Sequence, residues 1–209
     1  MARRCWRGMV CATSLRPQSW SARFLSIQTM RNSMPENALP DTVLAGFHLV
    51  RRPALGTKAV ERFGALTLET VFDATVLHVL GKPGDVAPMP PQGFDLRNAG
   101  PGQWFAVGPA SADQAVAAFG QAAFLVDQSH GRALIRISGA PVRNVLAKGT
   151  ALDLHPEQFA IGSATTTLIG HISVNLCHTG EDQFELLVLR GFAESLWDEL
   201  AGMAREFQE

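Results

Sequence analysis

Apolar and polar residues alternate along much of the chain, and this alternation predicts a series of short strands. Alternation with a period of two places every second side chain on the same face of a strand. The predicted strands are residues 66–70, 73–80, 103–108, 122–126, 132–137, 165–169, 172–177 and 184–189. Residues 82–91 interrupt the series, because they hold Gly84 and four prolines and are therefore expected to form a loop.

Helical spacing of apolar residues predicts three helices. Ser111 and Gln114 form a capping box at the start of the first helix, and Gly120 ends it. The second helix begins near Pro141 and ends at Gly149, and its core face is formed by Val142, Val145 and Leu146. The third has the longest apolar stripe, formed by Phe192, Leu196, Leu200, Met203 and Phe207. Because most neighbouring strands have no helix between them, the sequence predicts an α+β fold of mostly antiparallel sheets with few helices.

Two of the predicted strands differ in how polar their two faces are. Residues 184–189 are apolar on both faces, so this strand either lies at the centre of a sheet or is covered by a partner. In residues 172–177 the apolar face lies opposite a second face that carries Ser173, Asn175 and Cys177. We expect that second face to meet water.

The strand at residues 132–137 has one face that combines arginine with leucine. Arginine is enriched at protein interfaces, where it lies beside apolar side chains. We therefore expect a hetero-subunit interface with the following residues: Arg132, Leu134, Arg136, Leu187 and Leu189. Two other roles of Arg132 and Arg136 stay open, namely a solvated strand face and a bidentate grip on a carboxylate.

The formal net charge is −1, but the basic residues are concentrated at the N-terminus. Six arginines and no acid lie in residues 1–34, so the remainder is acidic and nucleic acid is a poor partner. We expect residues 1–45 to be a disordered basic leader and linker, and residues 46–209 to form one domain. Three interpretations of the leader stay open: a mitochondrial transit peptide, a disordered leader, or an upstream start codon before a true start at Met30 or Met34.

The chain offers few residues for catalysis or metal binding. Its three cysteines show no metal-ligand spacing, no glycine-rich phosphate loop occurs, and no apolar run reaches the roughly 20 residues that cross a bilayer. Asp127, Ser129 and His130 do not form a catalytic triad, because neighbours within one turn cannot orient one another. We expect a turn in which Asp127 or Ser129 caps backbone amides and Gly131 allows a tight bend. We therefore expect no catalytic residue, no metal site and no membrane span, and the cysteine usage fits a reducing, cytoplasmic compartment.

Five short segments occur in a fixed order along the second half of the chain. They are Gly102-Gln-Trp104, Asp127-Gln-Ser-His-Gly131, Leu146-Ala-Lys-Gly149, Leu152-Asp-Leu-His-Pro156 and Phe192-Ala-Glu-Ser-Leu-Trp197. Together they resemble the gamma subunit of the heterotetrameric sarcosine oxidases. That subunit is a small relative of the folate-binding aminomethyltransferase family, which includes the glycine-cleavage T-protein.

The resemblance implies an aminomethyltransferase-like folate-binding fold and a non-catalytic, structural role. It implies alpha, beta and delta partner chains in a complex that oxidatively demethylates sarcosine to glycine, with folate as the one-carbon acceptor. It also implies that this chain carries no cofactor, and that flavin, a dinucleotide, folate and zinc belong to the partners. Two alternatives stay open. A stand-alone folate-binding, aminomethyltransferase-like enzyme predicts a deep pocket with convergent polar groups. A homomeric scaffold predicts no ligand.

Deleting residues 2–33 is expected to leave thermal stability nearly unchanged. The reason is that this segment has six arginines, no acid and no apolar periodicity, so the sequence predicts no packing against the fold. Calorimetry on the full-length and shortened chains measures the difference in Tm. A shortened chain that melts more than a few degrees lower would show that the segment packs on the fold.

Overall fold

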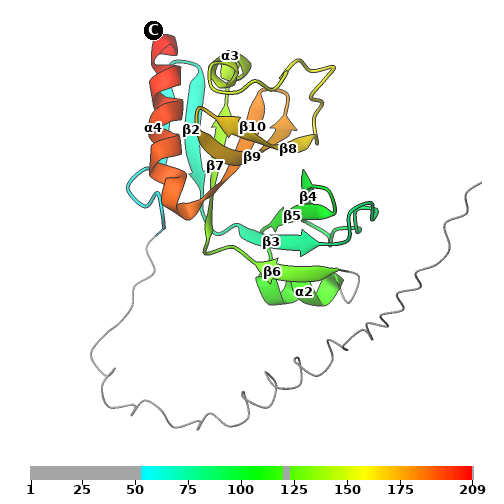
Figure 1. The fold of residues 1–209 in the computed structure, drawn as a ribbon. Coiled ribbons are helices and arrows are strands. Elements are labelled where there is room, and N and C mark those ends of the chain that lie inside the picture. Colours follow the sequence, from blue (N-terminus) through cyan, green and yellow to red (C-terminus); the bar gives the residue numbers. More distant parts are fainter. Residues whose placement is uncertain (1–52, 120–122, 209) are drawn as a thin grey trace, which may run out of the picture. The chain divides into compact units, whose positions relative to one another are not determined.

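The computed structural model describes residues 53–119 and 123–208, so the predicted leader at residues 1–45 lies outside the described residues. The described residues form two antiparallel sheets with few helices, as predicted (Figure 1). The six-stranded sheet has the order β1 (Val60–Phe63), β2 (Leu66–Val71), β7 (Arg132–Ser138), β10 (Gln183–Leu189), β9 (Ile172–Gly180), β8 (Ala164–Ile169). The four-stranded sheet has the order β4 (Asp95–Gly100), β5 (Gln103–Gly108), β3 (Thr75–Leu80), β6 (Phe124–Asp127). The helices are α2 (Ala112–Phe119), α3 (Val142–Ala147) and α4 (Ala193–Ala204), with short 3₁₀ turns at Arg190–Phe192 and Arg205–Phe207.

The four-stranded sheet is an insertion between two neighbouring strands of the six-stranded sheet. Strands β2 and β7 pair directly, with Leu68 opposite Ile137, although β3 to β6 lie between them in the sequence. The chain therefore crosses between the sheets twice. The two crossings are bound to each other, because the Gln128 amide donates to the Val76 carbonyl at 2.8 Å and the Val76 amide donates to the Ser129 hydroxyl at 3.0 Å.

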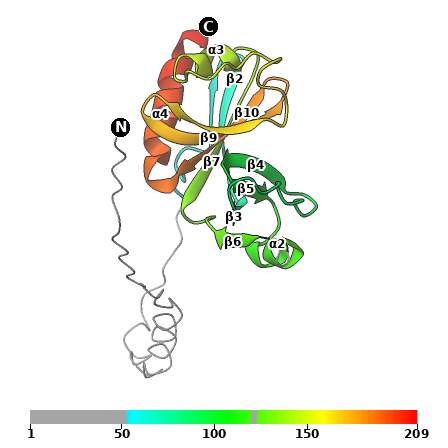
Figure 2. The ribbon, with the colours of Figure 1, turned by 45° about the vertical axis from the view of Figure 1, so that its right-hand side comes forward.

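Three apolar clusters show how the elements are layered (Figure 2). The largest cluster joins the six-stranded sheet to α3 and α4, with Ile137, Leu186 and Trp197 fully buried in it. A second cluster joins the outer face of the four-stranded sheet to α2. The third lies between the two sheets and consists of Val76, Phe105, Val107, Leu134 and Leu187. Each sheet thus packs against a neighbouring layer on both faces over part of its area.

This layering decides between the expectations for the strand faces. Strand β10 lies between β7 and β9, so its two apolar faces reflect a central position. On β9, Ser173 is exposed as expected, but the expectation that this face meets water was wrong for Asn175 and Cys177, which are 2% and 4% exposed. The second sheet covers them, and the Asn175 amide donates to the Asn98 carbonyl at 2.7 Å. Strands β1 and β4 were not predicted at all.

The predicted helices are present, with smaller corrections. The amide of Gln114 donates to the Ser111 hydroxyl at 3.4 Å, which confirms the predicted cap of α2, while Gly120 lies outside the described residues. In α3, the predicted core face is fully buried. In the predicted stripe of the last helix, Phe192 is 52% exposed and precedes α4, whereas Trp197 supplies most of the buried aromatic surface.

A single glycine sets the entrance to α3. Gly139 has φ +124°, a conformation that side chains rarely adopt, and a Cβ there would lie 2.1 Å from the Ala65 carbonyl oxygen. Its amide donates to the Asp182 carbonyl at 2.9 Å, and its own carbonyl accepts from the Val142 amide at 2.9 Å. The glycine thus joins β7, α3 and the β9–β10 turn in a space that admits no side chain.

Gly139→Ala is expected to destabilise the fold by at least about 2 kcal/mol, because it adds both backbone strain and a clash with backbone. Gly202→Ala is the matched control. Gly202 lies exposed within α4 with no atom near its missing Cβ, so alanine there is expected to stabilise the helix by about 0.5–1 kcal/mol. Urea unfolding of both variants measures the two changes in the free energy of unfolding. Equal changes would contradict the role of Gly139 as a position that admits no side chain.

Candidate functional site

The turn at residues 127–131 is built by its own polar side chains. The carboxylate of Asp127 accepts from the Ser129 amide at 2.9 Å and from the Ser129 hydroxyl at 2.6 Å. The Gly131 amide closes the turn by donating to the Gln128 carbonyl at 2.9 Å. These bonds confirm the predicted capping turn. Gly131 is not in the left-handed region of φ, so the bend does not depend on that property of glycine.

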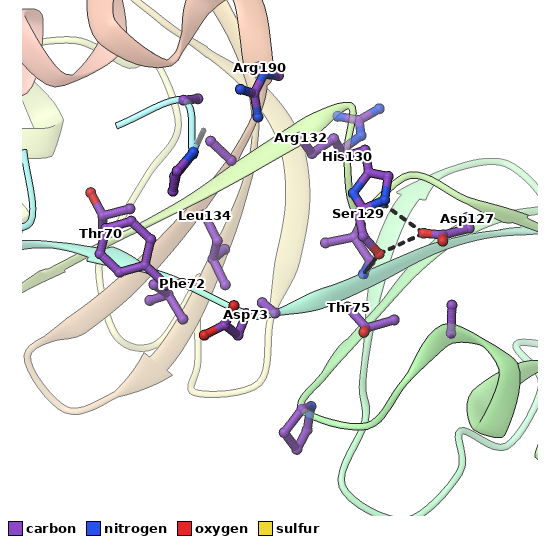
Figure 3. A pocket seen from close by; sticks show the side chains of 18 of the residues that line it. Thr70, Phe72, Asp73, Thr75, Asp127, Ser129, His130, Arg132, Leu134 and Arg190 are labelled. Atoms are coloured by element: carbon purple, nitrogen blue, oxygen red, sulfur yellow. Dashed lines mark hydrogen bonds between the residues drawn. The ribbon is translucent and has the colours of Figure 1, made fainter. Parts of the chain in front are cut away.

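A pocket of about 570 Å³ lies where the two crossings meet (Figure 3). Thr70 and Phe72 form one side of it, and Asp127 and Ser129 form the opposite side. Its lining also includes Asp73, which has φ +61° in the link from β2 to β3. An aspartate tolerates this left-handed conformation better than most residues. The pocket therefore results from the way the second sheet is inserted.

Two polar groups in this pocket, Ser129 and Asp127, are bonded to each other within the turn. The Ser129 hydroxyl donates its proton to Asp127, which orients it within the turn, and accepts from the Val76 amide, which joins the two crossings. A serine nucleophile needs a base that is in turn oriented by a third group. Among residues 53–119 and 123–208, no three His, Cys, Asp or Glu side chains are grouped to hold a metal ion.

A buried cluster of charges joins the sheets from the inside. Glu185 on β10 lies between two arginines and is 6% exposed. Arg136 on β7 donates to its Oε1 through Nε at 3.0 Å and through Nη2 at 2.8 Å. Arg97 on β4 donates to Oε2 through Nη2 and is 2% exposed. Cross-strand pairing places Glu185 opposite Arg136, whereas Arg97 comes from the other sheet.

This cluster affects the only cysteine of the described residues. Cys177 lies opposite Glu185 on the neighbouring strand and is buried. Burial raises the pKa of its thiol; the positive charge of Arg97 opposes this shift, and the negative charge of Glu185 adds to it. A raised pKa keeps the thiol protonated, so this cysteine is a packing residue rather than a reactive thiolate.

The five residues predicted as an interface fall into two groups. Leu134 and Leu187 are 4% and 0% exposed and pack between the sheets, while Arg136 is bound to Glu185. The apolar faces that suggested a partner are therefore satisfied within the chain at these positions. Arg132 and Leu189, which lie opposite each other on β7 and β10, keep exposed surface. The interface stays a prediction, and its accessible members are Arg132 and Leu189.

Arg132 and Leu189 line a second, smaller hollow, a groove of about 210 Å³ between the inner faces of the sheets. The Arg132 guanidinium lies over the Phe105 ring, 4.3 Å from its centroid, and Nε donates to the Gln128 side chain at 2.7 Å. Burial lowers the pKa of Arg132. The neighbouring His78 ring lies 4.9 Å from Phe105.

His78 is uncharged at neutral pH. Burial lowers its pKa from the ordinary 6.5, the Gln103 side chain opposes that shift, and the charge of Arg132 adds to it. The Nδ1 atom of His78 lies 3.3 Å from the Gln128 amide nitrogen. The groove therefore holds a positive charge, a neutral imidazole and an aromatic floor.

The sequence did not reveal which residues contact Glu185, Arg97, His78 and Asn175. Glu185 was counted only as part of an apolar strand, and Arg97 was not assigned to a strand. A charged residue inside an otherwise apolar strand is the one signal that points to such a cluster, since buried charges need partners. His78 and Asn175 also gave no sign, because a groove between two sheets depends on contacts that are distant in sequence.

Comparison with known proteins assigns this fold to a family. The model of the family described as "Sarcosine oxidase, gamma subunit family" matches residues 67–206. Among curated proteins, the sarcosine oxidase subunit gamma of an Arthrobacter species is 29% identical over 70% of this chain and 82% of its own length. That of Corynebacterium sp. (strain P-1) is 35% identical over 46% of this chain, and the match spans about half, 49%, of that relative.

Two solved structures share the fold. A chain of the heterotetrameric sarcosine oxidase from Corynebacterium sp. U-96 has a TM-score of 0.66 at 24% identity, covering 77% of this chain and 98% of that chain. The glycine cleavage system aminomethyltransferase T from Bartonella henselae has a TM-score of 0.51 at 15% identity, covering 68% of this chain and 47% of that chain. At these identities the likeness shows the fold, and it confirms the predicted aminomethyltransferase-like α+β fold.

Glu185→Gln is expected to destabilise the fold by about 3–5 kcal/mol, because it leaves the buried guanidinium of Arg97 and the partly buried guanidinium of Arg136 without their shared anion. The isosteric change keeps the shape, so packing does not explain the loss. Glu69→Gln is the control, since Glu69 is more exposed and only one oxygen lies near Arg136, at 3.5 Å. Its expected effect is below about 1 kcal/mol. Denaturant unfolding of both variants measures the difference, and similar values would refute the bridging role.

Proposed function

The chain belongs to the sarcosine oxidase, gamma subunit family, and we propose that it is the gamma subunit of a heterotetrameric sarcosine oxidase. One observation carries this proposal. The family match begins within β2 and ends within the last 3₁₀ turn, so it includes strands of both sheets, all but β1, and all three described helices. The likeness therefore concerns the whole arrangement, and not one motif that different proteins share.

We propose that the role of the chain is structural and that alpha, beta and delta chains are its partners. The positions of Asp127 and Ser129 support this role, because their side chains are used to hold the crossings between the sheets. In this proposal flavin, a dinucleotide, folate and zinc are bound by the partner chains, and the complex is cytoplasmic. In residues 53–119 and 123–208, no helix is long and apolar enough to cross a membrane.

A second candidate function is favoured by the larger pocket. A stand-alone folate-binding, aminomethyltransferase-like enzyme needs a pocket with convergent polar groups, and about 570 Å³ lies within the range of small-molecule sites, roughly 300–1,000 Å³. Titrating the isolated chain with tetrahydrofolate separates the two functions. Saturable binding to the isolated chain favours the enzyme, and binding that requires the larger chains favours the subunit.

The tagged full-length chain, expressed in its own organism, is expected to purify together with larger flavin-containing chains, because a subunit of the proposed complex binds its partners stably. Absorbance identifies the flavin, and peptide mass spectrometry identifies each co-purified chain. A wild-type chain that purifies alone, or that is itself yellow after separation from all partners, would overturn the proposal.

A further inference from the structure

Arg132 differs from every other arginine that the structure buries even in part. Within residues 53–119 and 123–208, four arginines are not classed as exposed: Arg97, Arg132, Arg136 and Arg143. Three of them have a carboxylate partner, namely Glu185 for Arg97 and Arg136, and Asp182 for Arg143. Arg132 has no carboxylate partner among the described residues, and its contacts are with Gln128 and Phe105.

The surroundings of Arg132 hold its charge in place without neutralising it. A partly buried guanidinium loses hydration, and this loss costs free energy unless an anion compensates it. The Gln128 side chain accepts one hydrogen bond, and the Phe105 ring offers a weaker cation–π attraction. His78 is neutral there and supplies no negative charge. The guanidinium of Arg132 in the groove therefore has no carboxylate partner from the described residues, although its charge would favour one.

A second unpartnered group lies in the same groove. Asn175 is 2% exposed, and its Nδ2 donates to the Asn98 carbonyl, but its Oδ1 has no hydrogen-bond partner in the structure. Buried polar atoms without partners are rare in native proteins. At the groove, Arg132 thus lacks an anionic partner among the described residues, and the buried Oδ1 of Asn175 lacks a hydrogen-bond donor. A peptide segment supplies both groups, through an acidic side chain and an N–H, whereas a simple carboxylate ion supplies only the first.

The rim of the groove matches a protein partner. Leu189 lines the groove opposite Arg132. Leu168 and Val126 pair with the groove residues Ser173 and His78, so each lies on the same sheet face as a groove residue. Leu189, Leu168 and Val126 are 47%, 53% and 46% exposed, respectively. An arginine surrounded by exposed apolar side chains has the composition of an interface centre. The volume of about 210 Å³ is below the range of small-molecule pockets, roughly 300–1,000 Å³.

We propose that the groove between the two sheets is a docking site for a partner subunit, which inserts an aspartate or glutamate side chain against Arg132. Apolar side chains of the same partner segment cover Leu189, Leu168 and Val126. This inference rests on the proposed function, because it takes the partner to be another subunit of the same oxidase. It names one arginine as the centre of that contact and assigns Leu189 to its rim.

The test uses the complete complex, obtained by expressing the full-length chain together with its co-purifying subunits. Arg132→Gln is expected to weaken assembly at least about tenfold, because it removes the charge that the carboxylate meets. Arg132→Glu is expected to abolish assembly through repulsion between like charges. Arg62→Glu is the matched control, since Arg62 is exposed on β1, an edge strand of the six-stranded sheet. This variant should assemble like wild type.

The stability of the isolated chain separates docking from a structural role. If Arg132 serves the partner, Arg132→Gln should leave the Tm of the isolated chain unchanged or higher, because it removes an uncompensated charge. If Arg132 serves only the fold, the Tm should fall, and assembly should fall with it; that result overturns the proposal. Assembly of Arg132→Gln at wild-type strength also overturns it, while leaving the proposed function intact. A wild-type chain that fails to assemble overturns the proposed function itself.

A cross-link identifies the occupant directly. A photoreactive phenylalanine analogue at Leu189 is expected to capture a partner-subunit peptide that contains aspartate or glutamate. Replacing that acid with arginine should restore assembly of Arg132→Glu. A captured peptide without an acid, or no capture within an assembled complex, contradicts the proposal. Saturable binding of acetate to the isolated chain, lost in Arg132→Gln, would instead make the groove a small-carboxylate site.

Discussion

The carboxylate of Glu185 is held by two arginines that come from different sheets, and the arrangement of the sheets depends on this contact. Arg136 reaches it from the neighbouring strand, and Arg97 reaches it from the inserted sheet. Apolar contacts between two sheets tolerate small sliding motions, because the hydrophobic effect has no direction. A charge-assisted bond has a direction, and breaking it inside the protein leaves unpaired charges. The ion cluster therefore selects one register of the two sheets.

The inserted sheet also explains where the cavities lie. Strands β2 and β7 pair with each other, and the chain leaves β2 for the inserted sheet and returns from it to β7. The two crossings between the sheets therefore lie side by side. The bonds from Ser129 to Asp127 and from Val76 to Ser129 fasten these crossings. The larger pocket is the space that remains around this junction. Its polar groups are first of all structural, and any ligand there has to compete with the bonds that close the fold.

The sequence predicted the elements with strong patterns and failed where structure depends on distant contacts. Strand β7 and helix α3 have clear periodicity, and both elements were predicted. Strand β4 contains polar residues and a bulge near Gly100, so it has no clean alternation and was missed. The wet face expected for β9 became buried because the insertion of a second sheet is not visible in local pattern. For the same reason, Leu134 and Leu187 suggested a partner when their partner is the chain's own second sheet.

The inner face of strand β10 changes character within a few residues, and this change relates stability to assembly. Glu185 lies in the ion cluster, Leu187 lies in the apolar cluster between the sheets, and Leu189 lies at the open groove. Strand β7 runs beside it in the same sequence of environments, from Arg136 through Leu134 to Arg132. A binding group is positioned more precisely on a strand than on a loop. The buried end of these two strands, at Glu185 and Arg136, therefore fixes the positions of the side chains at the groove end. The register that stabilises the fold thus also places Arg132.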